Sequence, residues 1–148
     1  MKALNPLLNY QLFGTQLTSL QDVNLLVVVL IVTTLVIFLT EITSNTATAT
    51  MMYPIMAALA VALDVHPLVL MVAASLAASC AFMLPVATPP NAVVFGSGYL
   101  RIPDMAKTGF LLNVVAIVLV TLTVYFLLSL ALGININTFP DAFRLKKQ

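Results

Sequence analysis

Between Asp22 and Arg101 the sequence carries only two formally charged side chains, Glu41 and Asp64. Of its 148 residues, 61% are hydrophobic and 7% are charged, whereas a soluble domain has about 25% charged residues. So few charges cannot cover a soluble core of this size, and we expect lipid to surround most of the chain. Because helices satisfy their own backbone in lipid, the long apolar runs predict an all-α, multi-pass integral membrane protein.

Apolar runs mark the candidate helices. Val23 to Thr40 would extend roughly 27 Å as a helix, close to the hydrocarbon thickness of a bilayer. Pro67 to Leu84 is rich in Ala and Ser, which let membrane helices pack closely. The longest run, Thr108 to Ile134, is the clearest full crossing. The sequence therefore divides into an amphipathic or interfacial segment (1–22), a transmembrane domain (23–134) and a polar C-terminal tail (135–148).

A first polar break, Thr40 to Thr50, interrupts the apolar sequence. Ser44 and Asn45 are favourable N-caps for a helix starting near Ala47, whose N-terminal N–H groups and partial positive charge would attract a carboxylate. The preceding helix would leave carbonyl oxygens free near Leu39 to Ile42, and freed carbonyls coordinate Na⁺ in broken helices. A solvent-exposed loop between two ordinary transmembrane helices explains the same composition.

A second polar break covers Pro85 to Asn91. Pro89 and Pro90 lack backbone N–H groups and would free the carbonyls four residues earlier in a helix. Thr88 and Asn91 add polar side chains, and Asn91 is a candidate cap for the helix that follows. A kinked helix without a ligand is the alternative. Irregular backbone at membrane depth survives only when it is buried in protein or lines a wet cavity, so the two breaks together favour a binding site.

Glu41 lies beside the first break, and an acid inside a membrane predicts a functional role by default. It could equally anchor the turn or face water. The sequence contains no Ser/His/Asp, Cys/His or HExxH arrangement and no glycine-rich phosphate loop. No residue set for enzymatic catalysis is therefore present. The low net charge of +1, without a basic cluster outside the C-terminal tail, also gives no indication of a nucleic-acid partner.

The two breaks carry a family resemblance. Thr40 to Thr48 reads TEITSNTAT, with a Ser-Asn-Thr signature, and Phe82 to Ala92 reads FMLPVATPPNA, with a Thr-Pro-Pro segment. With these motifs in this order, the chain resembles the divalent anion/sodium symporter family from roughly Val23 to Leu132. Members of that family carry succinate, malate, citrate or sulfate.

The resemblance implies a fold of two inverted repeats, each with one re-entrant helical hairpin and one broken transmembrane helix. This chain resembles the second repeat, so that residues 23–134 would be its transport domain. The implied elements are a hairpin over Val23–Leu63 with Ser44-Asn45-Thr46 at its tip, a broken helix over Pro67–Gly98 that is unwound around Ala87–Pro90, and a final transmembrane helix over Thr108–Leu132.

The resemblance also implies the site. Sodium would be held largely through backbone carbonyls, and the anion would bind between the hairpin tips of the two repeats. The implied sodium ligands are Thr40, Thr43, Ser44, Asn45 and Ala87. The implied substrate-binding residues are Asn45, Thr46 and Pro89, with Thr88 adjacent. Beyond sodium as the coupling ion, no cofactor is implied.

We therefore expect the C-terminal half of a secondary active transporter in the plasma (inner) membrane. It would move di- or tricarboxylates or sulfate, coupled to sodium. The family's first repeat is not found in this sequence, so the half would work with an N-terminal half or with a second copy, and the complete carrier would be a homodimer. The alternative is a non-transporting membrane fragment or an assembly subunit of a split carrier.

Overall fold

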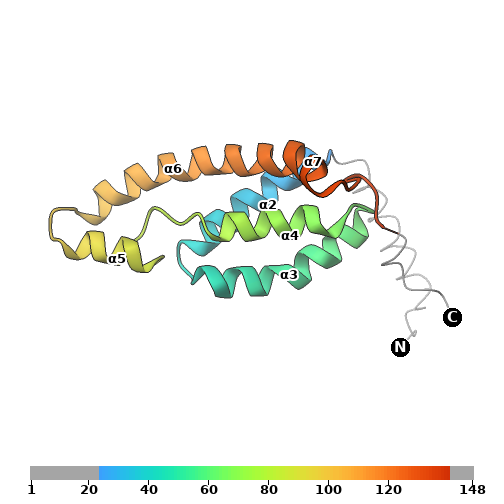
Figure 1. Cartoon of the computed structure of the whole chain (residues 1–148). Helices are drawn as coiled ribbons and strands as arrows, with labels where there is room; N and C mark the ends of the chain where they lie inside the picture. The colour runs from blue at the N-terminus through green and yellow to red at the C-terminus, as the bar shows by residue number, and fades with distance from the viewer. Residues whose placement is uncertain (1–23, 141–148) are drawn as a thin grey trace, which may run out of the picture.

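The computed structural model describes residues 24–140, which are entirely without β-strand. This confirms the all-α prediction, whereas the predicted interfacial segment 1–22 lies outside the described residues. The helices follow one another along an elongated bundle (Figure 1). They are α2 (Leu25–Thr40), α3 (Asn45–Ala62), α4 (Pro67–Ala78), α5 (Pro89–Gly96), α6 (Ile102–Leu122), a π-helical stretch η1 (Thr123–Leu127) and α7 (Leu128–Leu132).

Helices α2 and α3 form a helix–turn–helix within the range predicted for the hairpin. Ser44 is the N-cap of α3, and its Oγ accepts a hydrogen bond from the backbone N–H of Ala47 at 3.2 Å. The prediction that Ser44 caps this helix is confirmed. Asn45 is instead the first helical residue, so its side chain is available for other contacts.

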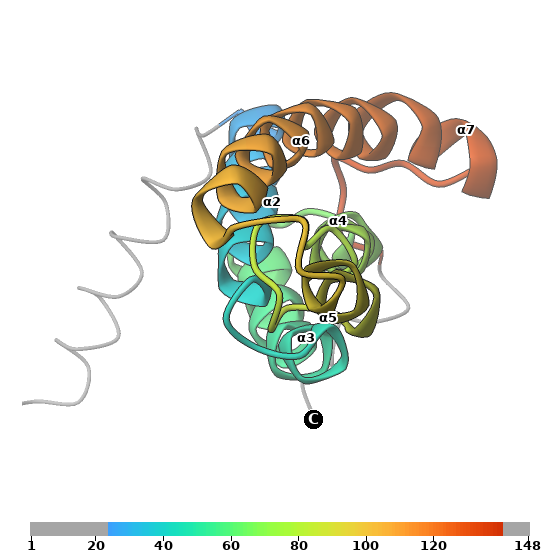
Figure 2. The ribbon, with the colours of Figure 1, turned by 90° about the vertical axis from the view of Figure 1, so that its left-hand side faces the viewer.

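Helix α4 lies between α3 and α6 in the bundle, and it also packs against α2 (Figures 1 and 2). Its contact surface is made of small side chains: Ala73, Ala74, Ala77 and Ala78 are all buried. Small residues let the backbones of neighbouring helices approach closely. The packing role predicted for the Ala-rich stretch is therefore confirmed.

The broken helix unwinds earlier than predicted. Helix α4 ends at Ala78 and α5 begins at Pro89, so residues 79–88 are non-helical. Ala87 and Thr88 are unwound as expected, but Pro89 and Pro90 are not, because they form the first turn of α5, where a missing N–H has no cost. The two prolines therefore start the second half-helix. The end of the first half-helix at Ala78, ten residues earlier, has a different cause.

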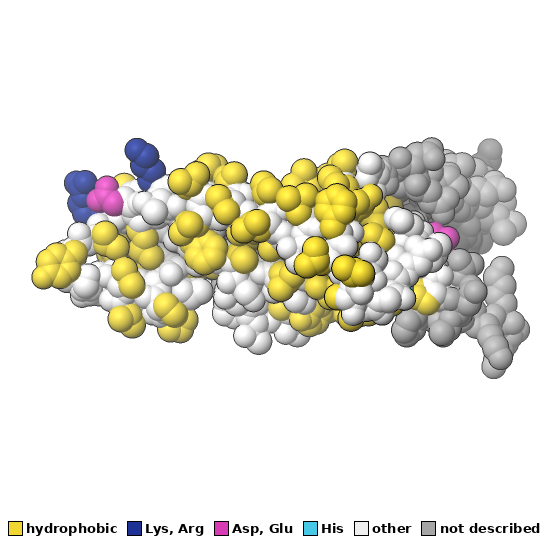
Figure 3. Space-filling view, turned by 45° about the horizontal axis from the view of Figure 1, so that its top comes forward, with side chains coloured by type: hydrophobic (Ala, Val, Ile, Leu, Met, Phe, Trp, Pro, Cys, Tyr) yellow, Lys and Arg dark blue, Asp and Glu magenta, His cyan; other side chains and the backbone are white. Residues whose placement is uncertain are grey.

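Helices α6 and α7 join through η1 into one apolar helix of 31 residues, Ile102–Leu132, which is long enough to cross a membrane. It begins at Ile102 instead of the predicted Thr108, because Pro103 and Asp104 are both favourable in a first turn. Figure 3 shows apolar side chains along this helix, with the Lys and Arg side chains of the described residues gathered at one end. The long apolar helix predicted from the sequence is confirmed.

Replacing Ala74 by Leu should destabilise the bundle, because the added atoms enter the fully buried contact surface of α4. We expect the free energy of unfolding to fall by about 1–3 kcal/mol. Ala58→Leu is the matched control, since Ala58 is exposed in the interior of α3. Thermal unfolding of the detergent-purified chain, followed by circular dichroism, measures both variants. Equal melting temperatures for the two variants would contradict the packing described for α4.

Candidate functional site

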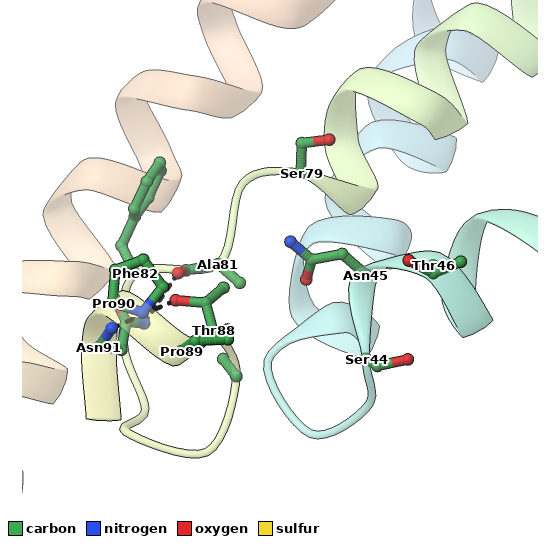
Figure 4. Close-up of a pocket in the computed structure, with 11 residues that line it drawn as sticks. Ser44, Asn45, Thr46, Ser79, Ala81, Phe82, Thr88, Pro89, Pro90 and Asn91 are labelled. Atoms are coloured by element: carbon green, nitrogen blue, oxygen red, sulfur yellow. Dashed lines mark hydrogen bonds between the residues drawn. The ribbon is translucent and has the colours of Figure 1, made fainter. Parts of the chain in front are cut away.

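The turn between α2 and α3 faces the unwound segment across a pocket of about 570 Å³. Six of the eight predicted site residues line it, and Figure 4 shows Asn45 reaching from the start of α3 toward the opposite wall. Thr40 and Thr43 do not line the pocket. The fold thus brings both polar breaks to one cavity. The six lining residues are Ser44, Asn45, Thr46, Ala87, Thr88 and Pro89.

The α3 wall offers hydrogen-bond donors. The Oδ1 atom of Asn45 accepts from the hydroxyl of Thr40 at 2.8 Å. Within residues 24–140 the amide nitrogen of Asn45 has no partner, so its two N–H groups remain available to a ligand. The first-turn backbone N–H groups of Asn45 and Thr46 also lack intrahelical partners, at the positive end of the α3 dipole. This wall suits an anion.

The α5 wall presents few backbone hydrogen-bond donors. Pro89 and Pro90 have no N–H, and the N–H of Asn91 already donates to Oγ1 of Thr88 at 3.4 Å. Thr88 therefore caps α5, and the prediction that Asn91 would do so was wrong. The side-chain amide of Asn91 donates to the carbonyls of Ala81 and Leu84, each at 3.0 Å. Asn91 braces the unwound backbone and is not free to bind a ligand with these groups.

Two helix C-termini meet beneath the tip. The hydroxyl of Thr40, at the end of α2, lies 2.9 Å from the carbonyl oxygen of Ala78, at the end of α4. Partial negative charge at both ends favours a cation here. The expectation of a free carbonyl at Leu39 was wrong, because that oxygen accepts from the N–H of Ile42 at 3.3 Å and from the hydroxyl of Thr43 at 3.0 Å.

Glu41 does not line the pocket and is 3% exposed. Its carboxylate accepts hydrogen bonds from the backbone N–H groups of Phe82, Met83 and Leu84 at 2.8–3.1 Å. The side-chain amide of Asn113 in α6 donates to it at 2.7 Å. Of the roles that the sequence left open, the structure supports the anchor. These bonds also explain the early break, because they satisfy N–H groups that have left the helix.

Sequence reasoning missed three features of this region. Ser79 lines the pocket but was assigned to helix packing, and the role of Gly109 depends on a distant segment. Asn113 could have been found from the sequence, since a lone amide in a long apolar run is costly in lipid and predicts a partner.

In the part of the chain that the structure describes, no group of three His, Cys, Asp or Glu side chains could hold a metal ion.

Comparison with known proteins identifies the family. Residues 4–132 match the family described as the sodium:sulfate symporter transmembrane region. Over 124 residues, 84% of this chain, the sequence is 58% identical to the sodium-dependent dicarboxylate transporter SdcS of Staphylococcus saprophyticus. It is 53% identical over the same length to the proteins of that name in Staphylococcus aureus strains MRSA252 and USA300.

The matched region is only 24% of the length of each of these relatives. The family match, residues 4–132, covers the turn, the unwound segment and the long C-terminal helix. On the extent of the family match, this chain belongs to the sodium:sulfate symporter family of membrane transporters.

Proposed function

We propose that this chain forms the second repeat of a sodium-coupled dicarboxylate carrier, with α2 and α3 as a re-entrant hairpin. The observation that carries the proposal is that the tip of the hairpin and the unwound segment line the same pocket. The names of the Staphylococcus relatives support sodium and dicarboxylate as the transported species. The family supports a membrane location, and we place the carrier in the plasma membrane.

The anion side of the proposed site is the start of α3. A carboxylate of the substrate would accept hydrogen bonds from the Asn45 amide and from the N–H and hydroxyl groups of Thr46. Such charge-assisted bonds are about twice as strong as neutral ones. Thr88 and Pro89 would close the opposite wall by contact, because the α5 terminus presents proline rings where it could have presented N–H groups.

The sodium side is the ring formed by Thr40, Thr43, Ser44, Asn45 and, across the pocket, Ala87. Backbone carbonyls are the main proposed ligands. The hydroxyls of Thr40 and Thr43 act as donors in the structure, so their oxygen lone pairs remain available to a cation. The adjacent C-termini of α2 and α4 add partial negative charge. A bound Na⁺ would thus hold the turn that presents Asn45 and Thr46 to the anion, and each ion would raise the affinity for the other.

This pocket supplies one side of a two-sided site. We propose that an N-terminal half or a second copy supplies the other side of the substrate site. The complete carrier would be a homodimer that works by alternating access. Helix α5 is consistent with such a partner, since none of its eight residues is buried. The relatives' names give no support to the alternative of a non-transporting fragment or assembly subunit.

Reconstitution tests the transport function. Proteoliposomes containing this chain and the N-terminal part of the Staphylococcus saprophyticus relative should take up labelled succinate when a Na⁺ gradient is imposed. Uptake by this chain alone would mean that two copies complete the site. Replacing Na⁺ by K⁺ is the control and should abolish uptake. If neither combination transports succinate, citrate or sulfate, the chain is a non-transporting component.

Asn45→Ala should raise the KM for both succinate and Na⁺ in the active reconstituted carrier. The substitution removes donors to a charged ligand and the acceptor that holds Thr40, so we expect a change of about tenfold or more. Asn137→Ala, at an exposed position beyond α7, is the matched control. Unchanged KM values for both ions in Asn45→Ala would refute the assignment of the tip as the binding site.

A further inference from the structure

Three consecutive backbone N–H groups converge on one buried side chain. Those of Phe82, Met83 and Leu84 donate to the Glu41 carboxylate, with Met83 shared between its two oxygens at 3.0 and 3.1 Å. The fourth donor is the Asn113 amide. Every one of these contacts comes from an N–H donor, which matches the acceptor-only ionised carboxylate. The four donors take the place of water around a charge that is buried in the molecule.

Gly109 brings α6 against the same segment. A Cβ atom at this position would lie 2.3 Å from the carbonyl oxygen of Phe82 and 2.6 Å from the Cα of Met83. Both are backbone atoms, which cannot rotate away as the end of a side chain can. Asn113 lies one turn further along α6 on the same face. Glycine at 109 thus allows the close approach that places the Asn113 amide on Glu41.

The side-chain oxygen of Asn113 is unpaired in the described part of the chain, which indicates why an amide stands at this position. The residue is fully buried, and its Oδ1 atom has no hydrogen-bond partner among the described residues. Burying an unpaired acceptor is costly, and a hydrophobic residue would avoid that cost. The amide group is therefore explained by its donation to Glu41 at 2.7 Å and by no other contact in this part of the chain.

We propose that Glu41, Asn113 and Gly109 form a clamp that sets the width of the pocket. Glu41 directly follows Thr40 at the turn, and the clamped segment continues into the wall at Phe82. Glu41 is then a positioning residue: it makes no contact with the ions and acts through the distance between the tip and the unwound segment. This inference rests on the proposed function for its effect on transport, but the clamp itself can be measured separately.

Hydrogen exchange tests the clamp without any transport assay. In the full 148-residue chain in lipid nanodiscs, peptides covering residues 80–88 should be protected. Glu41→Gln replaces one acceptor oxygen by a donor, and Gly109→Ala displaces α6, so both should accelerate exchange in this segment by about tenfold or more. The matched controls are Asp104→Asn, an exposed acid, and Gly96→Ala, whose Cβ would meet nothing within 4 Å. Unchanged exchange in Glu41→Gln would overturn the clamp.

A substitution on α6 separates this role from general instability. Asn113→Leu removes the α6 donor and keeps a similar side-chain volume, while the backbone N–H groups of residues 82–84 keep their acceptor. It should accelerate exchange in residues 80–88, and its effect should be non-additive with that of Glu41→Gln. An Asn113→Leu variant that is folded by circular dichroism and leaves this exchange unchanged would count against the clamp.

Transport kinetics test the positioning role. In the reconstituted carrier, Glu41→Gln should raise the KM for both Na⁺ and succinate by about tenfold. Loss of a residue that supports a metal ligand has an effect of this size on metal affinity. The maximal rate per folded carrier should change much less. Gly109→Ala should act on the same KM values and non-additively with Glu41→Gln. Faster exchange with unchanged KM values would overturn the positioning role. An inactive wild-type carrier would instead refute the proposed function, while the exchange result would stand.

Discussion

The hydrogen bonds from Phe82, Met83 and Leu84 to the Glu41 carboxylate are the interaction on which the rest of this structure depends. Backbone that leaves a helix inside a membrane protein needs partners from the protein itself. Glu41 satisfies the N–H groups of the unwound segment, and Asn91 satisfies the carbonyls of Ala81 and Leu84. Two side chains, one from each polar break, therefore make ten residues of irregular backbone tolerable, and that backbone forms one wall of the pocket.

The pocket has a positive and a negative side because α3 begins there, whereas α2 and α4 end there. Helix α3 begins with unpaired N–H groups, whereas α2 and α4 end beside each other through the contact between Thr40 and Ala78. Helix α5 also begins at the pocket, but its two leading prolines remove the donors that a helix start would normally present. The positive and negative ends are therefore separated by a single turn, which is a suitable arrangement for binding an anion and a cation next to each other.

Local features of this fold could be predicted from the sequence, and distant ones could not. Local sequence determines the apolar helices, the Ser44 cap and the two polar breaks. All of these are present as expected. The end of α4 at Ala78 depends on Glu41, about forty positions earlier in the chain, and no local pattern encodes that contact. The role of Pro89 and Pro90 was misread although Thr88, a good N-cap residue, directly precedes them and signals a helix start.

The depth of the clamp constrains how the site can move. Asn113 lies 11 residues beyond the start of a 31-residue apolar helix, or roughly 17 Å along a length of roughly 46 Å, so Glu41 would lie inside the bilayer when this helix crosses it. A charge at that depth is tolerable only while its donors stay in place. A motion that separated the hairpin from the unwound segment or from α6 would break five hydrogen bonds to a buried carboxylate. In the proposed carrier, the low-energy motion for alternating access would therefore carry α2, α3, the unwound segment and the first half of α6 together, with the sliding surface outside this group.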